Sequence, residues 1–131
     1  ELGGLLEGLD DETYVRTYID WEDRMLLMDG LTMCRFYRDF MTWERLASCV
    51  EQLNGAPVSR EELEALSNET VTRIRRLNLA FGATPADDTV AERFFREPTD
   101  CAPALDRDEL HRRVRLYWSL RGWTEEGLLP A

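Results

Sequence analysis

The sequence of 131 residues contains no lysine, a single histidine and only three cysteines. All 16 basic residues are therefore arginine, and 26 acidic residues bring the formal net charge to −10 at pH 7. The phosphates of a nucleic acid would repel a chain of this charge, so we expect no nucleic-acid partner. The one histidine, His111, stands beside two arginines without a placed acid or nucleophile, and nothing supports a catalytic triad.

The cysteines are few, odd in number and widely spaced, at Cys34, Cys49 and Cys101. This pattern excludes a disulfide-stabilised scaffold and favours a reducing cytoplasm. No apolar run approaches the ~20 residues that a membrane-spanning helix needs, and no basic-then-apolar signal segment opens the chain. We therefore expect a cytoplasmic protein without a membrane partner.

Strand-like alternation, internal repeats, glycine-rich phosphate loops and clusters of metal ligands at metal-binding spacing are also missing from the sequence. The length corresponds to one domain. We predict an all-α fold, an irregular bundle of about five or six helices. A flexible segment over residues 1–9, rich in glycine, should precede a single helical domain over residues 10–131.

Apolar residues with a 3.6-residue period predict the helices. The first helix runs from Asp10 to about Met28. Its apolar stripe, interpreted as core, is Tyr14, Tyr18, Trp21, Met25 and Met28, flanked by Val15, Ile19 and Leu26. Further helices are predicted over about 31–40, 42–53, 60–81, 87–96 and 106–121.

Capping residues support several of these helices. Ser59 and Glu62 form a capping box at the start of the longest helix, and Asp106 with Glu109 forms a second one. Asn54-Gly55, Gly82 and Gly122 mark helix ends. The adjacent acids Asp87 and Asp88 are interpreted as helix-capping residues rather than as an acid/base pair.

The loop after the first helix holds the most informative residues. Asp29 lies at the negative end of the helix dipole, where a carboxylate costs roughly 0.3–1 kcal/mol. A residue that breaks a local rule in this way is a candidate for function. Cys34 follows five residues later, so a carboxylate and a potential thiolate share one short loop and could serve one ligand.

The stretch from Asp29 to Cys34 resembles the Asp-x-x-Gly-Leu-Cys segment of the tungsten-containing aldehyde ferredoxin oxidoreductases. Asp29 and Cys34 match at the family spacing. Gly30 comes two positions before the family glycine, and Met33 replaces the leucine that precedes the cysteine.

Further segments toward the C-terminus resemble the family in the same order. We interpret the role of these segments as structural. The matching segments are Arg73-Ile74, Leu77-Asn78, Asp87-Asp88-Thr89-Val90, Glu92-Arg93-Phe94 and Tyr117-Trp118-Ser119-Leu120-Arg121-Gly122-Trp123. Two departures are Ala91, where the family has proline, and Asn78 to Gly82, which lacks the family arginine.

The resemblance implies that the chain is the C-terminal domain of a longer enzyme that oxidises aldehydes to carboxylic acids and passes electrons to ferredoxin. By the family pattern, Cys34 would be one ligand of a [4Fe-4S] cluster. Asp29 would hydrogen-bond the pyranopterin of the tungsten cofactor, and Met33 would touch that pterin through its backbone. The other cluster ligands would lie in preceding N-terminal domains of the same enzyme. The isolated chain should be inactive and should hold no cofactor.

Alternatives remain for these residues. Cys34 can also be read as a semi-buried thiol at a helix start, Asp29 as a surface carboxylate, and Cys49 as a small buried apolar side chain. The alternative for the whole chain is a free-standing helical interaction module, with Trp21, Tyr37 and Trp43 lining a binding groove. The residues do not indicate which aldehyde is used, whether the metal is tungsten or molybdenum, the oligomeric state or the roles of Cys49 and Cys101.

Overall fold

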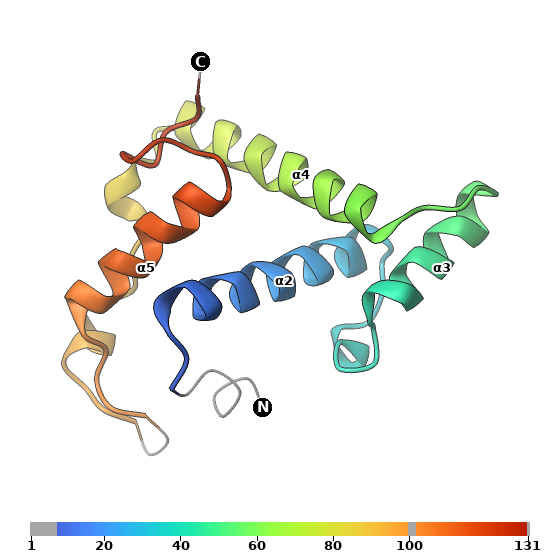
Figure 1. Ribbon diagram of the computed structural model, residues 1–131. Coiled ribbons are helices and arrows are strands. Elements are labelled where there is room, and N and C mark those ends of the chain that lie inside the picture. The colour runs from blue at the N-terminus through green and yellow to red at the C-terminus, as the bar shows by residue number, and fades with distance from the viewer. Residues whose placement is uncertain (1–7, 100–101, 131) are drawn as a thin grey trace. The chain divides into compact units, whose positions relative to one another are not determined.

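A computed structural model describes residues 8–99 and 102–130 of the chain, and in these ranges the fold is all-α, as predicted (Figure 1). Four α-helices are described: α2 (Asp11–Gly30), α3 (Trp43–Asn54), α4 (Arg60–Ala80) and α5 (Arg107–Leu120). Three short 3-10 helices lie between them: η1 (Arg35–Tyr37), η2 (Pro85–Asp87) and η3 (Glu92–Phe95). The described residues contain no strand and one isolated bridge, between Thr99 and Ala102.

The predicted count of five or six helices is too high for the described part of the chain. The segments 31–40 and 87–96 contain single 3-10 turns rather than helices. Both are too short to bury an apolar face, and helical stability in proteins comes mainly from such packing. Most of the predicted flexible segment lies outside the described residues.

The chain divides into two compact units, residues 1–16 with 75–131, and residues 17–74. Helices α2 and α4 contribute to both units. No described helix is both long enough and apolar enough to cross a bilayer.

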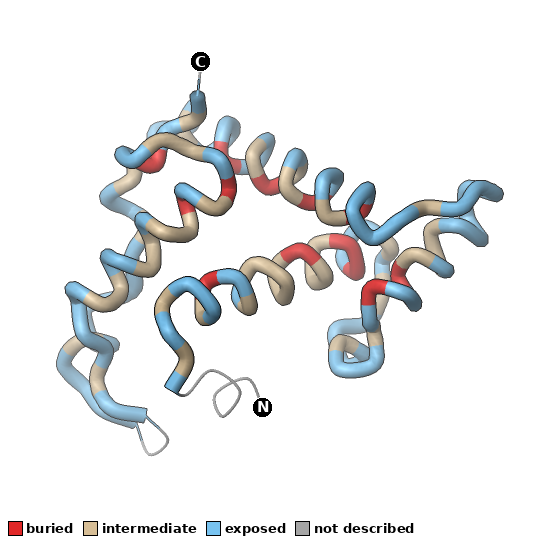
Figure 2. The backbone as a smooth tube through the Cα atoms, in the orientation of Figure 1, coloured by how far each residue is buried: buried red, intermediate tan, exposed pale blue. Residues whose placement is uncertain are grey.

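The unit of residues 17–74 is built on one apolar cluster. Its buried members are Leu27, Met28, Trp43, Leu46 and Leu63, which come from α2, α3 and α4. Met33 and Met41 pack against the cluster from the two ends of the segment that joins α2 to α3. Figure 2 shows that the backbone between these points is mostly exposed. The cluster therefore fixes both ends of the segment that carries Cys34.

The predicted apolar stripe of α2 is only partly correct. Val15 and Met28 are buried as predicted, but Tyr18 is half exposed. The buried face also includes Leu27 and the acidic residue Asp23. The observed face is therefore rotated relative to the predicted one.

The predicted helix boundaries and caps are largely confirmed. The side chain of Ser59 accepts from the Glu62 amide at 3.2 Å, and the Glu62 carboxylate accepts from the Ser59 amide at 2.8 Å. Asp106 accepts from the Glu109 amide at 2.7 Å, whereas the Glu109 carboxylate binds Arg113 instead.

Candidate functional site

Helix α2 ends in a Schellman turn that positions the candidate residues. The amide of Met33 donates to the carbonyl of Met28 at 2.8 Å, and the amide of Thr32 donates to the carbonyl of Asp29 at 3.0 Å. The first bond is the six-to-one bond and the second the five-to-two bond that define this motif. The motif requires a left-handed backbone at the residue just before Met33. That residue is Thr32, with φ of 57°.

Thr32 occupies the position at which the resembling family has glycine. A β-branched residue is strained in the left-handed conformation, where glycine is not. This difference in strain explains why a glycine suits that position of the Asp-x-x-Gly-Leu-Cys segment. Gly30 instead lies in the last turn of α2, with open space around its Cα.

Asp29 is exposed and forms a two-pronged ion pair with Arg35. The Nε atom of Arg35 donates to Oδ1 of Asp29 at 3.0 Å, and Nη2 donates to Oδ2. The hydrogen bond from Arg35 holds the pKa of Asp29 below its ordinary value, and the same bond raises the pKa of Arg35. The carboxylate is therefore ionised at neutral pH.

This ion pair corrects one part of the sequence argument. Asp29 was predicted to face the helix dipole without compensation, but Arg35 supplies a cation directly beside it. Sequence reasoning missed Arg35, since the pair joins residues across the turn rather than along a helix. The sequence feature that could have indicated this ion pair is the arginine directly after Cys34.

Cys34 is exposed and precedes the first residue of η1. The reading of Cys34 as a semi-buried thiol is therefore wrong. Because the neighbouring Arg35 binds Asp29, the turn brings the segment around Cys34 back toward the end of α2. Both candidate side chains thus belong to one short, water-accessible turn.

Met33 has a different environment from its two neighbours in the candidate site. Its side chain packs against the apolar cluster, and its amide is used by the Schellman turn. A pterin contact through the Met33 backbone would therefore use the carbonyl oxygen.

The residues that surround this turn do not form a complete metal site. Across residues 8–99 and 102–130, no group of three or more histidine, cysteine, aspartate or glutamate side chains could hold a metal ion. Cys34 offers one thiolate, whereas a [4Fe-4S] cluster takes four. Cys49 is half buried within α3, and Cys101 lies outside the described residues.

A charged node, formed by Asp20 and Arg24, bonds α2 to the start of α3. Oδ1 of Asp20 accepts from the indole nitrogen of Trp43 at 2.7 Å, and Oδ2 accepts from Nε of Arg24 at 3.0 Å. Arg24 also donates to the carbonyl of Met41 at 3.2 Å. This node connects α2 to the start of α3 and holds the far end of the Cys34 segment.

The interpretation of Asp87 and Asp88 as two capping residues is half correct. Asp87 forms a capping box with Thr84 at η2. Asp88 instead binds the buried Arg75 at 2.7 Å and accepts from the indole nitrogen of Trp118 at 2.9 Å. Arg75 is only 7% exposed. The two acids are structural, and they have different partners.

The described residues therefore form an all-α fold in which no complete metal centre is assembled. The family described as aldehyde ferredoxin oxidoreductase, domains 2 and 3, matches residues 5–131. The chain belongs to this family.

The chain is also similar to two curated tungsten-containing aldehyde ferredoxin oxidoreductases. It is 27% identical to that of Pyrococcus furiosus and 28% identical to that of Thermococcus kodakarensis, each over 118 residues. These alignments cover 88% of this chain and 20% of either relative, so the chain spans about a fifth of their length. No solved structure matches the chain.

Proposed function

We propose that this chain is the C-terminal part of a tungsten-pterin, iron–sulfur oxidoreductase that converts aldehydes to carboxylic acids with ferredoxin as electron acceptor. In this proposal Cys34 supplies one ligand of a [4Fe-4S] cluster, and Asp29 binds the pterin. The observation that carries it is the exposed turn that presents both side chains, in a chain of this family.

The thiol of Cys34 fits the role of a single cluster ligand. It is exposed, and both ends of its segment are held by Met33 and Met41 on the apolar cluster. A ligand placed in this way is positioned before the cluster is present, which limits the conformational cost of binding. The remaining thiolates would come from the preceding domains of the same enzyme.

The carboxylate of Asp29 fits the role of a pterin acceptor. The amino-pyrimidinone edge of a pterin presents two neighbouring N–H donors, and a carboxylate accepts such a pair with both oxygens. Arg35 presents the same kind of two-donor edge to Asp29 in this structure. The cofactor, when bound, supplies the two-electron chemistry, while Asp29 orients it and Cys34 holds the cluster nearby.

The alternative of a free-standing interaction module is weakened by the burial of Trp43, one of the three residues expected to line its binding groove. Trp43 is 5% exposed and its indole nitrogen is bonded to Asp20, so it cannot line an open groove.

Substitution of Cys34 in the full-length enzyme tests the ligand role. Cys34→Ser should remove most of the cluster iron, measured as iron per polypeptide and by the electron paramagnetic resonance signal of the reduced cluster. Cys49→Ser is the matched control, because Cys49 is half buried in α3, and it should leave the iron unchanged. Unchanged iron in Cys34→Ser would remove Cys34 from the ligand set.

Substitution of Asp29 tests the pterin contact separately. Asp29→Asn loses one of the two acceptor oxygens and should lower tungsten and pterin content while the cluster iron stays. Asp39→Asn, which changes another exposed aspartate of the same segment, should lower neither. Full tungsten loading in Asp29→Asn would refute the contact.

A further inference from the structure

We propose that the exposed aromatic residues of the segment that follows Cys34 form the docking surface for the part of the same enzyme that carries the remaining cluster ligands. This surface, called here the aromatic loop, consists of Phe36, Tyr37 and Phe40, which are 86%, 62% and 63% exposed. The inference rests on the proposed function and adds a partner surface to it.

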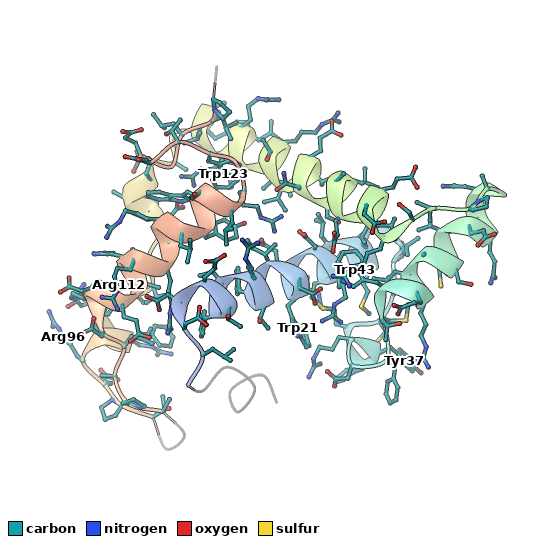
Figure 3. All side chains as sticks on the ribbon, in the orientation of Figure 1. Trp21, Tyr37, Trp43, Arg96, Arg112 and Trp123 are labelled. Atoms are coloured by element: carbon teal, nitrogen blue, oxygen red, sulfur yellow. The ribbon has the colours of Figure 1, made fainter. Side chains whose placement is uncertain are left out.

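The aromatic loop has a defined backbone. The amide of Tyr37 donates to the carbonyl of Cys34 at 3.0 Å, and the amide of Phe40 donates to the carbonyl of Tyr37 at 2.9 Å. Arg45 donates to the carbonyl of Phe40 at 2.5 Å. The backbone that carries the rings is therefore a bonded turn, and Figure 3 shows Tyr37 projecting away from the ribbon.

The composition of the aromatic loop is that of an interface. Aromatic residues and arginine are enriched in the buried centres of protein interfaces, and Arg35 and Arg38 flank the first two rings of the loop, with Asp39 before the third. Neighbouring large apolar side chains exposed together commonly mark an interaction site. A loop with this composition fits a polypeptide partner.

The position of Cys34 identifies which polypeptide this is. A cluster bound by Cys34 takes three more thiolates, and no group of metal ligands is assembled in the described residues. The segment that brings those thiolates must approach Cys34, whose neighbours along the chain are the rings of the aromatic loop. The curated relatives have about four fifths of their length beyond the matched region, which provides such a segment.

The other partners of the enzyme fit this surface less well. A ferredoxin must bind and leave in each turnover, and electron-transfer encounters use small interfaces. Permanent interfaces are more apolar, as the aromatic loop is. A second copy of the chain would cover the rings but would leave Cys34 without the different ligands that a cluster takes.

Hydroxyl-radical footprinting of the full-length enzyme tests the inference. Oxidation of Phe36, Tyr37 and Phe40 is compared between the folded holoenzyme and the same enzyme unfolded in urea. We expect at least tenfold protection of all three rings, independent of enzyme concentration and of added ferredoxin. Rings oxidised as fast as in the unfolded enzyme would overturn the inference. So would protection that appears only at high concentration, which indicates a second copy, or only with ferredoxin.

A triple variant measures how much the aromatic loop contributes to retention of the cluster iron. The triple variant Phe36→Ser, Tyr37→Ser, Phe40→Ser in the full-length enzyme should release cluster iron to a chelator about tenfold faster. Leu53→Ser, at a 73% exposed position of α3, is the control and should release it at the wild-type rate. Equal rates for the triple variant and the control would overturn the inference. The footprint of the unmodified enzyme decides the question if the triple variant fails to fold.

The two proposals fail in different ways. Retained iron in Cys34→Ser refutes the ligand role, whatever the footprint shows. Lost iron in Cys34→Ser together with unprotected rings keeps the ligand role and refutes the docking surface.

Discussion

Among the described residues Thr32 is the one non-glycine residue with a positive φ, because it takes the left-handed position of the turn that ends α2. A left-handed L-residue with a Cβ costs roughly 1–2 kcal/mol relative to its favoured conformation. The same turn orders Asp29, Met33 and Cys34, so the strain lies at the candidate site itself.

Thr32→Gly should therefore stabilise the chain by about 1 kcal/mol, because glycine adopts positive φ without steric cost. Urea unfolding at neutral pH measures the change. Gly30→Ala is the companion variant, since Gly30 is helical with open space around it, and it should add roughly 0.5–1 kcal/mol. A loss of stability in Thr32→Gly would show that the threonine side chain supports the turn.

Ser67 is fully buried in α4, and its hydroxyl has no hydrogen-bond partner among the described residues. A buried polar group without a partner costs about 1–3 kcal/mol, so Ser67→Ala should raise the unfolding free energy by at least about 1 kcal/mol. Ser48→Ala on the exposed face of α3 should change it by no more than about 0.5 kcal/mol, the helix-propensity difference. Equal effects at both positions would contradict the unpaired hydroxyl.

At the scale of elements, Arg75 of α4 bonds two segments that are distant in the sequence. It binds Asp88 in the segment after η2 at 2.7 Å, and it donates to the carbonyl of Gly127 at 2.8 Å. Asp88 in turn accepts from Trp118 of α5. A Cβ on Gly127 would lie 2.6 Å from the Trp118 ring, so only glycine fits at that position.

Asp88→Ala should destabilise the chain by about 3 kcal/mol, because it leaves a buried guanidinium without its anion. Asp87→Ala removes only a cap and should cost about 1 kcal/mol. Unfolding by urea compares the two adjacent positions directly. Similar losses in both variants would refute the distinction between cap and buried partner.

Asp11 at the start of α2 is tied to α5 by hydrogen bonds from Arg113 at 2.8 Å and Arg112 at 3.3 Å. These bonds, chiefly the one from Arg113, hold the pKa of Asp11 below its ordinary 3.8. A carboxyl with a lowered folded pKa stabilises the fold above its unfolded value, and this stabilisation is lost as the pH falls through the folded pKa.

Arg113→Leu should therefore raise the pKa of Asp11 toward 3.8 and weaken the loss of stability between neutral and strongly acid pH. Carbon-13 NMR of the Asp11 carboxyl measures the pKa. Arg112→Leu removes the longer bond and should raise it less. A pKa unmoved by Arg113→Leu would mean that the carboxyl is held by other groups.

Local elements were predictable because their signals lie within a few residues of each other. The Ser59–Glu62 box and the left-handed Gly55, Gly82 and Gly122 are of this kind. The bonds from Trp43 to Asp20 and from Arg75 to Asp88 join distant parts of the chain, and no spacing rule predicts them. Asp29 and Cys34 were singled out from their place after the first helix and their roles came from family resemblance, whereas the Asp29–Arg35 pair appeared only with the folded turn.

At the scale of the whole molecule, the long helix α4 buries only part of its apolar surface. Leu63, Ser67, Val71 and Arg75 are buried, while Leu66, Ile74, Leu77 and Phe81 remain exposed. The apolar period that predicted the helix therefore predicted its existence correctly and located its buried side only in part.

The 131-residue chain, purified by itself, should contain less than about 0.1 iron or tungsten per polypeptide, since a cluster takes four thiolates and the chain has three cysteines. Elemental analysis measures the metal, and circular dichroism should show a mainly helical spectrum in the same sample. Stoichiometric metal in a folded chain would contradict the shared-site proposal.

Every cation in the ion pairs described here is a guanidinium, because the chain has no lysine. Guanidinium groups keep their charge above pH 12, where lysine would already be largely neutral. The electrostatic contribution to this fold is therefore one-sided: acid removes it carboxylate by carboxylate, whereas mild alkali leaves every pair intact.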